Sequence, residues 1–128
     1  MSELRYEVHG AIDRVALQQL FDASWEGSGP QYGSEFDYLL SWVCAYEGAA
    51  LVGFVSVAWN GGGHAFLLDT TVHPDHRRRG VGVELVRLAT DAARDAGCEW
   101  LHVDYEAVLG RFYQECGFTE SAAAVMRL

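Results

Sequence analysis

The stretch His73–Leu85, HPDHRRRGVGVEL, holds three of the chain's nine basic residues and follows them at once with two glycines. It lies between an apolar segment that ends at Val72 and a segment of helical periodicity that ends near Ala96. The first amide groups of a helix have no acceptor within it, and the helix dipole adds roughly half a positive charge there. Gly80 and Gly82 leave those amides uncovered and the arginines add charge, so the stretch predicts a site for a pyrophosphate-sized anion.

Other interpretations of this stretch are weaker. A run of three arginines alone is often a solvated surface, and a lone Gly-x-Gly is a weak signal, but their succession between a strand and a helix favours the anion site. A dinucleotide-binding fingerprint fits poorly because Leu85 takes the place of its third glycine. His73 and His76 lie three residues apart without a cysteine nearby, so no metal site is predicted.

Composition narrows the class of protein. With 128 residues, half of them hydrophobic and 21% charged, the chain is expected to form a single globular domain over residues 1–128. Its formal net charge of -9 argues against a general nucleic-acid or anionic-membrane binder and favours a cationic partner. The chain has no lysine, which excludes Schiff-base chemistry on lysine and the phosphate-binding lysine of a Walker loop.

The cysteines and the N-terminal residues indicate a cytoplasmic location. Cys44, Cys98 and Cys116 form no close pair and no metal-ligand spacing, so reduced thiols are expected. The N-terminal MSELRYEVHG lacks the basic and then apolar run of a signal peptide, and no apolar stretch approaches the length of a membrane span. We therefore expect a soluble, cytoplasmic protein that binds no membrane. The oligomeric state is left open, with a homodimer as one alternative.

The remaining segments alternate between strand-like and helix-like periodicity, which predicts an α/β (α+β) fold. A Gly- and Ser-rich loop is expected at residues 26–34, with Ser34 as the N-cap of a short helix. The helix from Gly80 has an apolar stripe of Val81, Leu85, Leu88 and Ala92 and ends at Gly97. Strands are expected at residues 4–10, in three runs within 41–74, at 98–106 and at 118–128, and helices at 11–23, 36–40, 80–96 and 108–117.

The residues VHPDHRRRGVGVELV resemble the acetyl-CoA signature of the GNAT superfamily of N-acetyltransferases. In that signature, Val-x-Pro is followed by Arg or Gln, two variable residues, Gly, one variable residue and then Gly or Ala, at the start of a helix. The later RFYQECGF, residues 111–118, resembles the family's second segment. The order of strands and helices agrees from about residue 3 to 128, although residues 23–42 carry no family signal. The matching signature positions are Val72, Pro74, Arg77, Gly80 and Gly82.

The resemblance implies a GNAT-like mixed, twisted β-sheet flanked by helices and splayed between the strand ending at Val72 and the strand at 99–105. It implies that acetyl-CoA is the co-substrate in that cleft, with its pantetheine arm on the backbone of the first strand and its pyrophosphate on the amides after it. Tyr113 would be the general acid that protonates the departing thiolate. The implied cofactor-binding residues are Thr70, Val72, Arg77, Arg78, Arg79, Gly80, Val81, Gly82 and Val83, and no metal is implied.

The function implied by the resemblance is direct acetyl transfer from acetyl-CoA to a primary amine of a small molecule, peptide or protein. The alternative is a non-catalytic acyl-CoA-binding regulatory module. The general base is not implied, because Phe66 stands where some members have a glutamate and Glu106 stands near the place of a frequent asparagine. Ordered water is one alternative, and the side chains that have suitable chemistry are Asp69, His64, His102, Asp104 and Glu106.

Four aromatic residues near the segment without family signal have two interpretations. They are Trp25, Tyr32, Tyr38 and Trp42. They either line the acceptor pocket or belong to the hydrophobic core.

Overall fold

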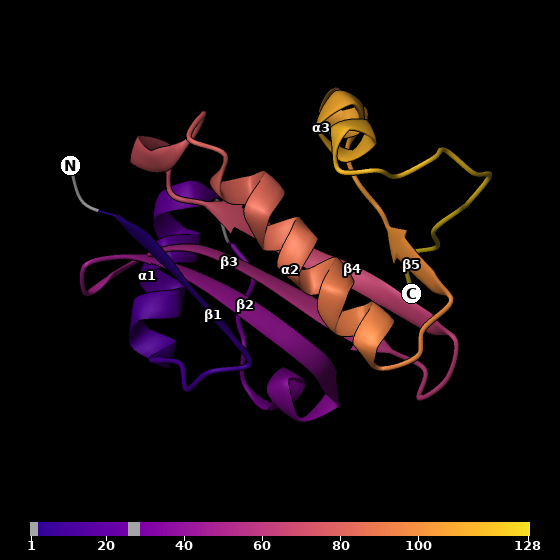
Figure 1. Ribbon diagram of the computed structural model, residues 1–128, viewed down its shortest axis with the longest axis horizontal. Helices are drawn as coiled ribbons and strands as arrows, with labels where there is room; N and C mark the ends of the chain where they lie inside the picture. The colour runs from indigo at the N-terminus through magenta and orange to yellow at the C-terminus, as the bar shows by residue number, and fades with distance from the viewer. Residues whose placement is uncertain (1–2, 26–28) are drawn as a thin grey trace.

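Five strands form one mixed sheet in the computed structural model, which describes residues 3–25 and 29–128 (Figure 1). The strands lie in chain order, neighbours from β1 to β4 are antiparallel, and β4 and β5 are parallel. The predicted mixed sheet flanked by helices is therefore confirmed. The strands are β1 Leu4–Val8, β2 Leu39–Glu47, β3 Ala50–Trp59, β4 His64–Val72 and β5 Trp100–Val103.

Three α-helices accompany the sheet, with α1 on one face and α2 on the other (Figure 1). Asp13 caps α1 by accepting hydrogen bonds from the backbone amides of Val15 and Ala16. None of the described helices is long and apolar enough to cross a membrane. The helices are α1 Arg14–Ser24, α2 Val81–Asp95 and α3 Gly110–Glu115, with 3₁₀ turns at Ser34–Tyr38, Pro74–His76 and Ala107–Leu109.

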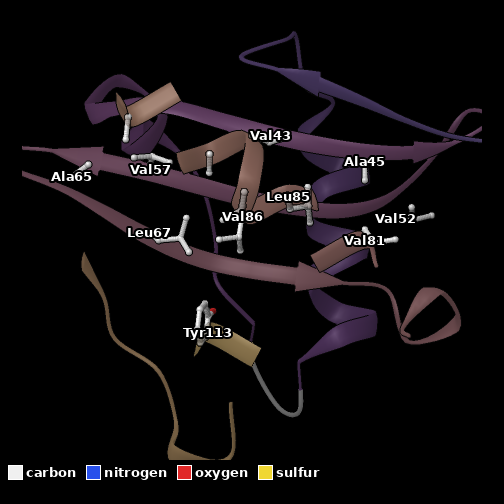
Figure 2. Close-up of a cluster of buried hydrophobic side chains, with 13 residues drawn as sticks. Val43, Ala45, Val52, Val57, Ala65, Leu67, Val81, Leu85, Val86 and Tyr113 are labelled. Carbon is white, nitrogen blue, oxygen red and sulfur yellow. The ribbon is translucent and has the colours of Figure 1, made fainter. Parts of the chain in front are cut away.

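The alternation of side chains along the central strands gives the protein two hydrophobic clusters. In β3, Val55 and Val57 face α2, whereas Phe54 faces α1, as expected for a strand that is covered on both faces. The α1 cluster contains Leu17, Leu20, Phe21, Cys44 and Phe54. The α2 cluster contains Val43, Ala45, Val52, Val55, Val57, Ala65, Leu67, Val81, Leu85, Val86, Ala89, Ala93 and Tyr113 (Figure 2).

The predicted apolar stripe of α2 was only partly correct. Val81 and Leu85 are fully buried, but Leu88 and Ala92 are partly exposed, and the buried face continues through Val86, Ala89 and Ala93. Periodicity identifies an apolar side of a helix, while contact with the sheet selects which residues of that side are covered. The predicted end is confirmed, since Gly97 has a φ of 90° and donates its N–H to the Arg94 carbonyl.

Two local predictions were wrong. Ser34 is not an N-cap: the short helix there is a 3₁₀ turn whose capping position is Gly33, which makes no side-chain capping bond. The segment Thr119–Leu128 forms neither helix nor strand, because a strand requires a hydrogen-bonded neighbour and none of the described strands pairs with it. The predicted loop at 26–34 lies partly outside the described residues.

Gly53 lets α2 pack closely on β3. A Cβ atom at this position would lie 3.0 Å from the side chains of Leu85 and Val81 and 3.2 Å from Ala45 Cβ. Gly53→Ala should therefore overpack the cluster and lower the free energy of unfolding by about 1–3 kcal/mol. Gly63→Ala is the control, because the added Cβ meets only Glu99 Cβ, at 4.0 Å. Equal urea midpoints for the two variants would contradict this packing.

Candidate functional site

The cleft expected from the sequence lies where β4 and β5 separate. Their pairing runs from His64 with Trp100 to Leu67 with Val103, while β4 continues to Val72 along β3. The register of β4 against β3 shifts at this point, and Asp69 has a φ of 56°. These are the features of a β-bulge, which bends a strand and redirects its side chains.

The separation leaves backbone groups of β4 directed away from β3. The N–H of His73 donates to the Val52 carbonyl at 2.8 Å, so the residue after β4 still points toward β3. Because successive residues alternate, the N–H and C=O of Val72 point to the opposite edge, as do those of Thr70. These two residues thus present hydrogen-bonding backbone to the space beyond the last β4–β5 pair.

The first turn of α2 fits an anion. Gly80 is the capping residue with a φ of 77°, a conformation that suits glycine, and it provides no side-chain cap. The first α-helical bond comes from Glu84 N–H to the Gly80 carbonyl, so the amides of Val81, Gly82 and Val83 have no acceptor within the helix. A Cβ on Gly80 would meet no atom within 4 Å, which leaves the approach open.

Gly82 has a role that the sequence did not suggest. A Cβ at this position would lie 3.1 Å from two ring carbons of Phe112, which precedes Tyr113 on α3. The missing side chain therefore makes room for α3 against the first turn of α2, in addition to exposing the backbone.

The three arginines are not equivalent. Arg79 forms an ion pair with Glu47 at 3.1 Å, and His76 Nε2 lies 3.1 Å from the same carboxylate. Arg77 makes a long contact of 3.5 Å to the Ser24 carbonyl, and Arg78 is exposed with a φ of 64°. The hydrogen bonds from His76 and then Arg79 lower the pKa of Glu47. Arg79 thus ties the turn after β4 to the β2–β3 hairpin, while Arg78 remains exposed to solvent.

Tyr113 lies next to the open part of β4. The ring is buried in the α2 cluster, which also contains Leu67 (Figure 2). It stacks on the ring of Tyr105, with centroids 4.9 Å apart. Burial raises the pKa of Tyr113, and a hydrogen bond with the Thr70 side chain opposes that increase. The hydroxyl therefore stays protonated at neutral pH and lies beside the strand on which the resemblance places the pantetheine arm.

A second polar group lies on the α1 side of β4. Tyr32 donates a hydrogen bond to Asp69 Oδ2 at 2.6 Å, and Ser56 Oγ lies 2.6 Å from the same hydroxyl. Burial and then the bond to Asp69 raise the pKa of Tyr32, so it acts as a donor to the carboxylate. Trp25 Nε1 donates to Thr71 Oγ1 at 3.1 Å, two residues after Asp69 on β4. Ser56 and Thr71 were missed in the sequence, although a polar residue within an apolar strand was the available signal.

The other candidates lie apart from this site or have structural contacts. Trp42 stacks on His9 and donates its indole N–H to the Gly10 carbonyl, and Tyr38 is exposed. His64 and His102 approach each other at 2.8 Å on the exposed face near the start of β4. The exposed Asp104 and Glu106 follow β5. None of these candidates is in hydrogen-bonding contact with Asp69 or Tyr113 in the described part of the chain.

Two of the cysteines are poorly suited to act as nucleophiles. Burial raises the pKa of Cys44 to about 11 and also raises that of Cys116, which disfavours a thiolate nucleophile. No group of three or more metal-ligating side chains occurs within residues 3–25 and 29–128.

A cavity of about 370 Å³ lies between α2 and α3 and is lined by Val83, Arg87, Thr90, Asp91, Arg94, Glu115 and Cys116. On α2 the cavity runs from Val83, in the first turn, to Arg94, near the end of the helix.

The model of the acetyltransferase (GNAT) family matches residues 13–118, which include the open part of β4, the first turn of α2 and Tyr113. The chain belongs to this family. A mycothiol acetyltransferase of Mycolicibacterium vanbaalenii is 36% identical over 62 residues, which are 48% of this chain and 21% of that protein. The chain therefore spans only about a fifth of that relative.

Solved structures of the family share the fold. A GNAT family protein of Streptococcus pneumoniae aligns with a TM-score of 0.79 and 18% identity over 98% of both chains. The aminoglycoside N-acetyltransferase AAC(6')-Iy in complex with CoA aligns with a TM-score of 0.77 and 18% identity over 100% of this chain and 95% of that one. At these identities the likeness shows the fold alone.

The Glu47 ion pairs should stabilise the protein in a pH-dependent way. Because the pKa of Glu47 is lower in the folded state, its contribution is present above the unfolded pKa and is lost as the pH falls through the folded value. Glu47→Gln should therefore lower Tm at pH 7, and its difference from the wild type should shrink toward pH 3. Glu99→Gln, at an exposed carboxylate, is the control. A Tm difference for Glu47→Gln that is constant over this range would rule out the ionic contribution.

Proposed function

We propose that this acetyltransferase moves an acetyl group from acetyl-CoA directly to a primary amine. The observation that carries the proposal is the meeting of three features at one point: the open backbone of β4, the uncapped first turn of α2 and the buried hydroxyl of Tyr113. A related fold, AAC(6')-Iy, is an aminoglycoside N-acetyltransferase with CoA bound.

The cofactor lies, in this proposal, along the α2 and α3 side of β4. The backbone of Thr70 and Val72 binds the pantetheine arm, and the amides of Val81, Gly82 and Val83 bind the pyrophosphate. Arg77 and Arg78 lie near the same turn and supply positive charge. Arg79 acts indirectly, because its pairing with Glu47 holds the turn in place.

The acceptor approaches from the α1 side, where the Asp69 carboxylate faces Tyr32 and Ser56. An alkyl ammonium must lose a proton before its nitrogen attacks the thioester carbonyl, and Asp69 is the only one of the five candidate bases on the bulge of β4. We propose that Asp69 binds the ammonium and accepts that proton, either directly or through water. Tyr32 keeps the Asp69 carboxylate oriented by donating a hydrogen bond to it. Because burial raises the pKa of Tyr32, its hydroxyl stays protonated and remains the donor.

The chemistry then needs two more proton transfers, one from the attacking nitrogen and one to the departing sulfur. Attack forms the C–N bond and a tetrahedral oxyanion, which a backbone N–H of the open strand stabilises. Collapse of that intermediate breaks the C–S bond, and the departing thiolate takes a proton from the Tyr113 hydroxyl. The nitrogen gives its second proton to solvent, and a proton from solvent restores the Tyr113 hydroxyl. The products are the acetylated amine and CoA as free thiol, with no covalent enzyme intermediate.

The test is a panel of primary amines with acetyl-CoA, monitored by release of free thiol. Amine-dependent release supports the transferase. Saturable binding of acetyl-CoA without release for any amine would instead support a regulatory acyl-CoA-binding module. Failure of acetyl-CoA to raise Tm at all would overturn both assignments, since a ligand at about 100 times its Kd contributes about 2.7 kcal/mol.

Tyr113→Phe should retain the fold and most of the affinity for acetyl-CoA but lower kcat. A positioned general acid contributes roughly 10²- to 10⁴-fold, and the phenyl ring still packs against Tyr105. The measurement is steady-state turnover beside the acetyl-CoA Kd, with Tyr38→Phe, at an exposed position, as the control. Unchanged turnover would show that Tyr113 only packs, and parallel loss of turnover and affinity would make its hydroxyl a binding group.

Asp69→Asn should lower kcat/KM most strongly for cationic amines. The substitution keeps the size of the side chain but removes the negative charge and the proton acceptor. A positioned general base typically contributes roughly 10²- to 10⁴-fold to the rate, so a decrease in this range is expected. The wild type should prefer cationic over neutral amines of similar shape, and salt should weaken that preference. The control is Asp95→Asn at the exposed end of α2. A wild-type pH profile retained in Asp69→Asn would assign the proton transfer to water.

A further inference from the structure

The first half of β4 exposes aromatic and apolar side chains on the α1 face of the sheet. Ser56 pairs with Leu68, and the Ser56 hydroxyl contacts Tyr32 of the α1 cluster, so Leu68 points to the α1 face. Because side chains alternate along a strand, Phe66 and His64 point to the same face. One face of β4 therefore carries an imidazole, a phenyl ring and a leucine side chain at successive outward positions.

β5 adds two more rings to this face. The β4–β5 register places Trp100 beside His64 and His102 beside Phe66. The ring of His102 stacks on both His64 and Phe66, with centroids 5.0 Å and 4.9 Å apart and interplanar angles of 29° and 17°. Phe66, Leu68 and Trp100 are nevertheless 40%, 41% and 58% exposed. We call these five residues the exposed row.

The exposed row lies beyond the part of the sheet that α1 covers. α1 packs on β2 and β3 through Cys44 and Phe54, and its cluster contains no side chain of β4 or β5 in the described part of the chain. Figure 1 shows α1 at the β1 side of the sheet, away from β5. A contiguous apolar surface of this kind marks a place where a ligand or another protein binds.

The exposed row continues directly into the proposed acceptor site. Asp69 follows Leu68 on β4, and the bulge turns its carboxylate to the α1 face, where it accepts the hydrogen bond from Tyr32. A strand rises about 3.3 Å per residue, so Phe66 lies roughly 10 Å from Asp69 along β4. One small molecule can therefore place an ammonium at the carboxylate and an aromatic ring on Leu68 and Phe66, when a short alkyl linker joins the two.

Charge favours such a ligand over a second copy of the chain. A carboxylate at the end of the row attracts a cation, whereas two copies that each carry a formal net charge of -9 repel each other. An aromatic group also suits the row better than an aliphatic one, because rings pack on one another in offset-stacked or edge-to-face contacts that add to the burial of apolar area.

We propose that the acceptor is a primary amine joined to an aromatic ring by a short alkyl linker, with its ammonium at Asp69 and its ring on Leu68 and Phe66. This inference rests on the proposed acetyl transfer and names the class of amine that receives the acetyl group. His102 acts as a positioning residue, because its stacked ring restricts the orientation of Phe66. A free arylalkylamine and an aromatic residue at a peptide N-terminus share this chemistry.

The first test compares kcat/KM for three amines with acetyl-CoA: phenethylamine, cyclohexylethylamine and ethanolamine. Phenethylamine should be the best acceptor. Its advantage over cyclohexylethylamine, which has the same linker and a saturated ring, reports aromatic packing separately from apolar burial. Phenylalanine amide beside alanine amide makes the corresponding comparison for a peptide N-terminus. A larger aromatic preference in the amide pair would assign the ring to an N-terminal residue and not to a free amine.

The second test removes the ring of Phe66. Phe66→Ala should lower the ratio of kcat/KM for phenethylamine to that for ethanolamine by roughly 3- to 10-fold, the range expected for loss of one aromatic contact. Phe66→Tyr keeps the ring and should retain the ratio. Trp59→Ala is the matched control, because Trp59 is an exposed aromatic residue whose β4 partner, Ala65, packs in the α2 cluster on the opposite face. Far-UV circular dichroism verifies that each variant is folded.

Binding is measured separately, by calorimetric titration of phenethylamine and of ethanolamine into the protein in the presence of CoA. Tighter binding of phenethylamine that Phe66→Ala weakens supports the aromatic site. If that binding occurs and no amine is acetylated, the transferase is overturned and the amine site stands.

Three results would overturn the aromatic acceptor and leave the transferase standing. The first is equal binding of phenethylamine and ethanolamine, with transfer to both at similar kcat/KM. The second is an aromatic preference that Phe66→Ala leaves intact. The third is a wild-type dimer in light scattering that Phe66→Ala converts to monomer, which would assign the exposed row to a second copy of the chain.

Discussion

The site depends on the way β4 distributes its backbone hydrogen bonds. β4 pairs with β3 along nearly its whole length but with β5 only as far as Leu67. Backbone N–H and C=O groups require hydrogen-bond partners, so where a strand has no neighbouring strand these groups must bind something else. Here the bulge at Asp69 bends the strand at that point, and Thr70 meets the hydroxyl of Tyr113 from α3. The opening is thus a consequence of sheet geometry and not of a loop folded over the surface.

β4 also separates two chemical environments. On its α2 and α3 side lie the amides of the first helical turn and a buried tyrosine whose pKa is raised by burial. On its α1 side lie the Asp69 carboxylate and the tyrosine that donates to it. In the proposed function, a positive field for a phosphate-bearing ligand and a negative group for an ammonium therefore face opposite sides of one strand. Electrostatics alone would favour binding of the two ligands from different directions.

Several residues that support the site act through packing or ion pairs. Phe112 occupies the space left by Gly82, which brings α3 and its tyrosine close to the start of α2. Glu47 holds both His76 and Arg79, so the turn between β4 and α2 is attached to the β2–β3 hairpin. These contacts restrict the position of the helix start relative to the sheet, and a preorganised donor loses less entropy on binding an anion.

The sequence by itself determined the features that depend on neighbouring residues: the strand periodicities, the central strand covered on both faces, the glycines and arginines at the start of α2, and the position of Tyr113 in its short helix. Tertiary structure decided the rest, because those contacts join residues far apart in the chain. Tyr32 reaches Ser56 and Asp69 across 24 and 37 residues, and Arg79 pairs with Glu47, 32 residues earlier in the chain. The strand-like pattern of Thr119–Leu128 shows the same limit: periodicity states which residues suit a strand, but only a neighbouring edge can supply the hydrogen bonds that form one.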